Sequence, residues 1–115
     1  MAIQKFEDII VWQKAQDFSV AIYNEFKNSK DYSFNDQIKR ASVSISKNIA
    51  EGFDRSSNPD FKRFLYFALA SNSEVRSMLY LAVRLNFISE LASKKLIDNS
   101  NEIARMIFGL IKSLK

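Results

Sequence analysis

The chain has 115 residues, 47% of them hydrophobic, which is the length of one domain with enough apolar side chains for a core. Two glycines, one proline and no cysteine argue against an all-β fold rich in tight turns, a disulfide framework and a thiolate metal site. The net charge of +4 admits an anionic partner without requiring one. The N-terminal sequence predicts neither a signal peptide nor a transmembrane span, so we expect a single all-α domain over residues 1–115, located in the cytoplasm.

The first half of the chain predicts two helices. A helix over residues 8–27 is predicted by apolar side chains that recur every three or four residues: Val11, Ala15, Phe18, Ile22 and Phe26. Polar residues end this pattern at Asn28. Ser33 then offers an N-cap for a second helix over residues 34–53.

The second half predicts two further helices. Asn58 can cap a helix that has Pro59 at its first position, where the missing N–H is harmless, and this helix is expected over residues 59–86. Ser89 caps a fourth helix over residues 90–113, whose apolar residues recur at nearly heptad spacing. The turn-forming residues 98–101 could break this helix, although the repeat continues through them. Short connections between four helices predict an antiparallel up-down four-helix bundle.

The third helix carries more apolar surface than one small bundle needs. Between Phe61 and Leu85 its apolar side chains span about 200° of arc, twice the ~100° stripe of an ordinary amphipathic helix. Either this helix is central within the monomer, or part of its surface is covered by another subunit. We favour self-association into a homo-oligomer.

Signatures of catalysis are missing from the sequence. The chain has no histidine, which removes the commonest general base and the usual nucleophile pairs. Residues 44–47 match a Ser-x-x-Lys pattern by chance, because its companion elements are missing, and no glycine-rich loop could hold a nucleotide phosphate. We predict a non-enzymatic protein without a cofactor, a metal site or a small-molecule substrate.

A stripe of polar side chains follows the second helix and continues on the third. It could be a ligand site, or the residues could satisfy one another between packed helices. We favour a structural polar network, and we expect Arg40→Ala to cost several kcal/mol, as removal of one partner of a buried pair does. The residues of this network are Gln37, Arg40, Ser44, Asn48, Glu51, Ser71 and Glu74.

A second polar stripe on the third helix alternates cations with hydroxyaromatic residues. Lys and Arg can hold phosphates while Tyr stacks on bases, so the stripe is a candidate nucleic-acid-binding surface. It can also be an ordinary solvated face, and the sequence leaves both interpretations open. The candidate residues are Lys62, Tyr66, Arg76, Tyr80 and Arg84.

Three segments of the chain resemble a known family. They are Phe-Glu-Asp-Ile-Ile-Val-Trp-Gln-Lys-Ala at residues 6–15, Asp-Gln-Ile-Lys-Arg-Ala-Ser-Val-Ser-Ile-Ser-Lys-Asn-Ile-Ala-Glu-Gly at residues 36–52, and Arg-Phe-Leu-Tyr-Phe-Ala-Leu-Ala-Ser-Asn-Ser-Glu at residues 63–74. The chain resembles the small four-helix-bundle proteins encoded in intervening sequences of bacterial 23S ribosomal RNA genes. This resemblance implies an antiparallel four-helix bundle that forms a ring-like homopentamer. A related bundle is the accessory protein of diversity-generating retroelements, where a basic pentamer associates with a reverse transcriptase and nucleic acid.

Two functions therefore compete. In the first, a cytoplasmic homo-oligomer, expected to be a pentamer, binds RNA or another anionic nucleic acid by charge and shape. In the second, the bundle is a scaffold for a protein partner, such as a reverse transcriptase or a ribosome-associated factor. Salt-sensitive RNA affinity with little base preference would favour the first, and weak nucleic-acid affinity the second.

Overall fold

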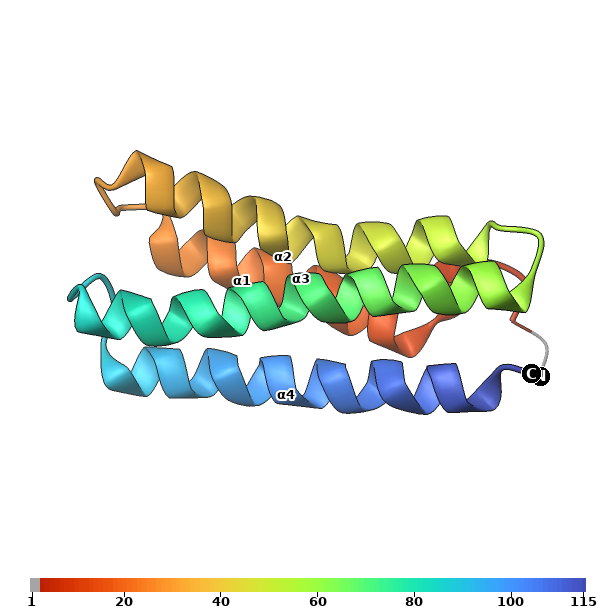
Figure 1. Cartoon of the computed structure of the whole chain (residues 1–115). Helices are drawn as coiled ribbons and strands as arrows, with labels where there is room; N and C mark the ends of the chain where they lie inside the picture. The colour runs from red at the N-terminus through yellow and green to blue at the C-terminus, as the bar shows by residue number, and fades with distance from the viewer. Residues whose placement is uncertain (1–2) are drawn as a thin grey trace.

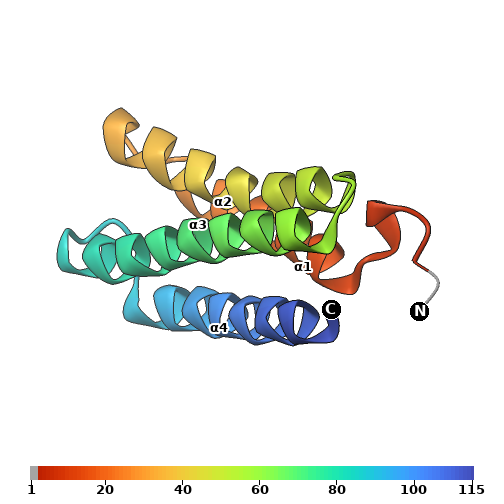
Figure 2. The ribbon, with the colours of Figure 1, turned by 45° about the vertical axis from the view of Figure 1, so that its right-hand side comes forward.

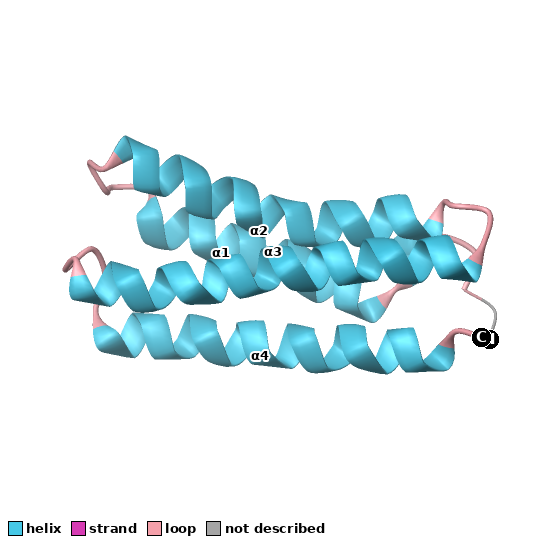
Figure 3. Ribbon diagram, viewed as in Figure 1, coloured by secondary structure: helices cyan, strands magenta, loops and turns pink. Residues whose placement is uncertain are grey.

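The computed structural model describes residues 3–115 and is all-α, with no strand within that range (Figure 3). A short 3-10 turn over Phe6–Asp8 precedes four long helices. These are α1 (Ile10–Phe26), α2 (Tyr32–Phe53), α3 (Asn58–Arg84) and α4 (Glu90–Ser113). The all-α prediction with four helices is therefore confirmed.

The four helices pack side by side as a bundle measuring 44 × 22 × 19 Å (Figure 1). Each helix contacts its neighbours in the order α1, α2, α3, α4 and back to α1, whereas neither diagonal pair is in contact in the described part of the chain. The loops that join successive helices lie at alternate ends of the molecule in Figure 1. The contact between α2 and α3 is the most extensive, and Figure 2 shows these two helices running alongside one another.

Helices α2 and α3 start two residues and one residue earlier than predicted, because other side chains cap them. The carboxylate of Asp31, not the hydroxyl of Ser33, accepts a hydrogen bond at the start of α2, from the backbone N–H of Phe34 at 3.0 Å. Ser57, not Asn58, caps α3, whereas Ser89 caps α4 as predicted. A capping oxygen satisfies one of the first backbone N–H groups of a helix, which have no partner within it.

The first and third helices are shorter than predicted. Helix α1 begins at Ile10 rather than residue 8, because Phe6–Asp8 form the separate 3-10 turn and the Phe6 ring packs edge-on against Trp12. Helix α3 ends at Arg84 because Asn86 has a φ of 61°. The backbone N–H of Phe87 donates to the carbonyl of Ala82 at 2.8 Å, which completes a Schellman motif and stops the helix.

Helix α4 runs without a break through residues 98–101, because tertiary contacts use the side chains that favour turns. The side chains of Asn72 and Ser100 are fully buried between α3 and α4. The Ser100 hydroxyl donates to Oδ1 of Asn72 at 2.9 Å, and Nδ2 of Asn72 donates to the Ser100 carbonyl at 3.0 Å. This reciprocal pair satisfies both side chains in the core and fixes the register of α3 against α4.

The predicted polar network between α2 and α3 forms only in part. The Ser44 hydroxyl accepts from Ser71 and from Asn48, each at 2.9 Å, and the Gln37 amide donates to the Glu74 carboxylate at 3.2 Å. Two expected members lie outside it, and both are paired within α2. The Arg40 side chain is 80% exposed and binds Asp36, and the Glu51 carboxylate lies 4.0 Å from Lys47.

The expectation that Arg40 is a buried charge is therefore wrong for the monomer. Arg40 lies on the outer surface of α2, farther from α3 than the stripe formed by Ser44 and Asn48. At this position the long side chain extends into water instead of toward α3, so it pairs with a carboxylate of its own helix.

In the part of the chain that the structure describes, no helix is long and apolar enough to span a membrane.

Helices α2 and α3 approach each other closely at Gly52. A Cβ atom at this position would lie 2.6 Å from Cβ of Phe64 and 3.0 Å from Cδ1 of Phe61. Neither neighbour can move freely, because both phenylalanines are buried and Phe61 stacks edge-on against Phe53. Gly52 therefore permits a helix contact that any side chain would prevent.

We predict opposite effects for alanine at the two glycines of the chain. Gly52→Ala gains helix propensity but forces α2 and α3 apart, and we expect it to lower the free energy of unfolding by about 1–3 kcal/mol. Gly109→Ala is the matched control, because a Cβ there has nothing within 4 Å. It should raise the free energy of unfolding by about 0.5–1 kcal/mol. Urea denaturation of both variants tests this, and a stabilised Gly52→Ala protein would contradict the close contact.

We also predict that Arg40→Ala is nearly neutral. Because its ion pair with Asp36 is exposed, the loss should be no more than about 0.5 kcal/mol in the free energy of unfolding. Asn72→Ala should cost about 2–3 kcal/mol, since it removes both buried hydrogen bonds to Ser100. The same denaturation measurement compares them. An equal loss at the two positions would show that Arg40 is not on a solvated surface.

Candidate nucleic-acid interface

The predicted nucleic-acid-binding residues lie on the outer side of α3, next to α4. All five fall within about 80° of arc on α3, as their spacing requires. A matching stripe on α4 lies beside them, connected by a hydrogen bond of 3.1 Å from the Arg76 guanidinium to Oδ1 of Asn101. We call the combined surface the α3–α4 face. It consists of Lys62, Tyr66, Arg76, Tyr80 and Arg84 from α3, with Lys94, Asn101, Arg105, Phe108 and Lys112 from α4.

The carboxylates of α3 and α4 are mostly directed elsewhere. Asp60 binds Arg63 at 2.8 Å, Glu74 accepts from Gln37 of α2, and Glu102 binds Lys14 of α1 at 3.4 Å. Among residues 3–115, Lys94 is the one cation of the α3–α4 face with a carboxylate within 4.0 Å, namely Asp98. The face therefore carries a local excess of positive charge that the modest net charge of the chain does not reveal.

Three aromatic rings lie exposed between these cations. Tyr66 is 53% exposed, Tyr80 is 59% exposed and Phe108 of α4 is 49% exposed. No cation lies over these rings in the described structure, whereas Lys39 covers the ring of Tyr23 at 5.1 Å. Their faces are therefore available to stack on another flat group.

A groove is set into the α3–α4 face near the α3–α4 loop. It has a volume of about 540 Å³ and lies between Tyr80 and Arg84 on one side and Lys94 on the other. Its more buried lining residues are Val83, Ser93 and Ile97. Glu90, Asp98 and Asn101 supply further polar groups. It thus combines an aromatic ring, charges of both signs and an apolar base.

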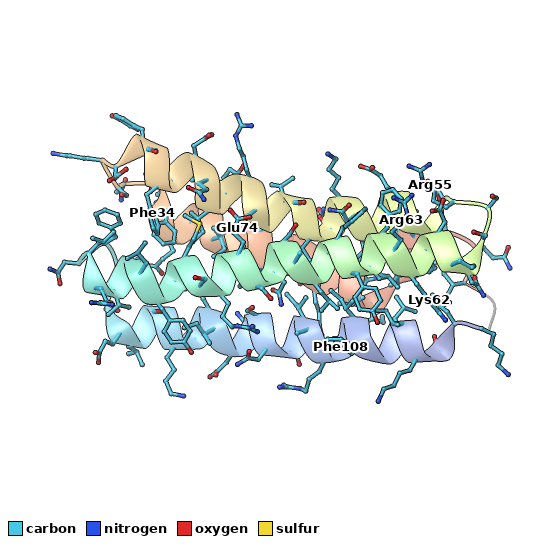
Figure 4. All side chains as sticks on the ribbon, viewed as in Figure 1. Phe34, Arg55, Lys62, Arg63, Glu74 and Phe108 are labelled. Carbon is cyan, nitrogen blue, oxygen red and sulfur yellow. The ribbon has the colours of Figure 1, made fainter. Side chains whose placement is uncertain are left out.

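A second cluster of cations and aromatic rings lies on the other side of α3. Figure 4 shows Arg55 and Arg63 together beside α2, whereas Lys62 extends toward α4. The two guanidinium carbons lie 4.6 and 5.1 Å from the centroid of the Phe64 ring. Because Phe64 is buried and Asp60 neutralises Arg63, this cluster stabilises the α2–α3 contact rather than offering an open site.

Sequence reasoning found the α3 half of the α3–α4 face and missed the α4 half. The missing residues recur at Lys94, Asn101, Arg105, Phe108 and Lys112, a spacing that places them on one side of a helix. That pattern was visible, but its position beside the α3 stripe depends on how the two helices are rotated. Within residues 3–115 the structure contains no group of three or more acidic side chains that could hold a metal ion.

Comparisons with known proteins agree with this fold. The family model described as 23S rRNA-intervening sequence protein matches residues 7–109. A solved structure from Bacteroides thetaiotaomicron VPI-5482, described as a protein with unknown function from the S23 ribosomal protein family, is 30% identical in sequence. The match covers 90% of this chain and 99% of that one, with a TM-score of 0.85. No curated protein matches the chain. The chain belongs to the family of 23S rRNA-intervening sequence proteins.

Proposed function

We propose that this protein is a non-enzymatic, cytoplasmic RNA-binding bundle that contacts its ligand through the α3–α4 face. One observation carries the proposal: exposed aromatic rings lie between cations of which, among the described residues, only Lys94 has a carboxylate within 4.0 Å. Lys62, Arg105 and Lys112 are positioned to neutralise phosphates, and each neutralised phosphate releases counterions.

Recognition by this face depends on charge and shape. Phosphate contacts position a protein on a nucleic acid without reading its sequence. The groove of an RNA duplex that displays base edges is wide and shallow, and a duplex is bound mainly through its backbone. An elongated face with dispersed cations suits such a backbone. We therefore expect affinity for structured RNA to depend strongly on salt and only weakly on sequence.

We further propose that the chain is an up-down bundle that assembles into a ring-like homo-oligomer, a pentamer by its resemblance to the family. Two separate apolar patches support this. One lies at the C-terminal end of α3, on the side toward α2, and contains Leu81 and Leu85, each 46% exposed. The other lies between α1 and α2 and contains Val20 and Val43. Two different patches suit a head-to-tail contact, in which one patch of each subunit binds the other patch of the next, and repeated contacts of this kind form a ring when the rotation between subunits closes. Because neither patch belongs to the α3–α4 face, this assembly leaves that face open to RNA.

The RNA proposal predicts a loss of affinity when charge is removed from the face. Fluorescence anisotropy with two unrelated RNA hairpins, over a salt series, should give similar affinities and a steep salt dependence for the wild-type protein. The double variant Arg84→Gln, Arg105→Gln should bind about ten-fold more weakly, with the salt slope reduced by about two.

The matched control for this pair is Lys27→Gln, Lys30→Gln, which removes the same charge from residues outside the α3–α4 face. We expect that control to stay within about three-fold of the wild type, because its cations make no phosphate contact. Equal losses in the two double variants would show that net charge alone drives binding. A wild-type protein that binds neither hairpin at low salt would overturn RNA binding and favour the protein-scaffold function.

The assembly proposal predicts that Leu81→Glu separates the subunits. A carboxylate in the α3 patch would be desolvated in the contact, so light scattering after size exclusion should fall from about five chain masses to one, 13.3 kDa. Leu91→Glu is the control, because Leu91 is 81% exposed and lies in neither patch. It should leave the assembly unchanged. A wild-type protein that is monomeric at micromolar concentration contradicts the proposal.

A further inference from the structure

The groove near the α3–α4 loop has features that the rest of the α3–α4 face lacks. From the geometry we propose that it is a subsite for one unpaired nucleotide whose base carries an exocyclic amino group. The base stacks on Tyr80, and the phosphate of the same nucleotide lies beside Arg84. The amino group of the base donates to a carboxylate of α4. This inference rests on the proposed RNA-binding function and adds a place on the surface and a ligand class to it.

The ring of Tyr80 is positioned between two arginines. Arg76, Tyr80 and Arg84 follow one another at intervals of four residues, about 6 Å along the helix axis for each step. Arg76 is held by Asn101, whereas Arg84 has no carboxylate within 4.0 Å among the described residues. A base that stacks on Tyr80 therefore has a guanidinium on each side of it for the adjoining phosphates.

The charges of the groove distinguish a single nucleotide from a duplex. Glu90 and Asp98 lie among its lining residues, so the groove is not a uniformly positive surface like the rest of the face. A duplex offers these carboxylates mainly phosphates, which they repel. An unpaired base instead offers N–H donors on its pairing edge, and a carboxylate accepts readily from an amino group such as N4 of cytosine.

The ion pair in the groove does not prevent this. Lys94 and Asp98 lie 3.7 Å apart, one turn apart on α4, with side chains 75% and 66% exposed. Such exposed pairs contribute little free energy, so Lys94 can turn toward a phosphate while Asp98 accepts from the base. The volume of about 540 Å³ lies within the usual range of small-ligand sites.

Other grooves lack this combination. The groove between α1 and α2 has one aromatic ring, Tyr23, and Lys39 already covers it. The two grooves between α1 and α4 have no Tyr or Trp and no arginine among their lining residues. The groove near residues 86–87 places Phe87 beside two carboxylates without an arginine. Of these five grooves, the α3–α4 groove is the one suited to a stacked, phosphate-bearing ligand.

The first test separates stacking from charge. In fluorescence anisotropy, Tyr80→Leu should weaken binding of a single-stranded cytidine dodecamer about ten-fold, with an unchanged salt slope, because a stacking partner is lost without loss of charge. Binding of a blunt-ended RNA duplex, which offers no unpaired base, should change by less than about three-fold. Tyr32→Leu is the matched control, because Tyr32 is an exposed tyrosine at the start of α2 that lies outside the α3–α4 face and does not line the groove. It should leave both affinities within about three-fold.

The second test uses free nucleotides and does not depend on RNA binding. Cytidine and uridine 5′-monophosphate share a phosphate and a pyrimidine ring and differ at the 4-position, where cytidine has an amino group. In a titration followed by NMR, cytidine monophosphate should shift the backbone amides of residues 80–84 and 94–98, and uridine monophosphate should shift them several-fold less at equal concentration. Circular dichroism of each variant checks that the helices are intact.

The outcomes distinguish the two proposals. If wild-type protein binds the duplex but Tyr80→Leu leaves the dodecamer affinity unchanged, the nucleotide subsite is wrong and the RNA-binding function stands. If neither RNA binds but cytidine monophosphate shifts these amides in preference to uridine monophosphate, the subsite stands as a free-nucleotide site and the RNA function is overturned. Equal shifts with both nucleotides overturn the preference for an amino-bearing base, and no shift with either overturns the subsite.

Discussion

The close contact between α2 and α3 at Gly52 determines how α3 is presented to solvent. Because no Cβ separates Gly52 from Phe64, α2 packs closely against α3, and the Asn72–Ser100 pair fixes the register of α3 against α4. A helix held against two neighbours presents its remaining side to solvent. That outward side carries Tyr66, Tyr80 and Arg84. The α3–α4 face is therefore a consequence of packing as much as of composition.

The distribution of charge follows from the same packing. On α3, Asp60 and Glu74 lie on the side next to α2, where Arg63 and Gln37 bind them, and Glu102 of α4 reaches Lys14 of α1. Acidic and basic residues are nearly balanced in the sequence, with 13 and 17 respectively, yet cations outnumber carboxylates on the α3–α4 face. An anionic partner would experience the local excess of cations rather than the net charge of the whole chain.

Sequence reasoning recovered what depends on periodicity and missed what depends on three-dimensional placement. The apolar repeat located all four helices, and the Ser89 cap was predicted correctly, because both signals are local. Arg40 was misplaced because a helical wheel gives the direction of a side chain but not the position of the neighbouring helix. The uninterrupted α4 was uncertain for a similar reason, since the buried partner of Ser100 lies 28 residues away in sequence. The α4 half of the α3–α4 face was missed, because its position beside the α3 stripe depends on how both helices are rotated about their axes.

The α3–α4 face is not uniform along its length, and this difference has a chemical consequence. Away from the α3–α4 loop, Lys62, Arg105 and Lys112 surround Tyr66 and Phe108 without an acidic residue on the face. Near the loop, Glu90 and Asp98 line the groove beside Tyr80. The part away from the loop suits a polyanionic backbone of any sequence. The part near the loop disfavours such a backbone, because its carboxylates repel phosphates. In the proposed RNA-binding function, an RNA with a paired stem and an unpaired end would satisfy both parts at once and would be preferred over a continuous duplex.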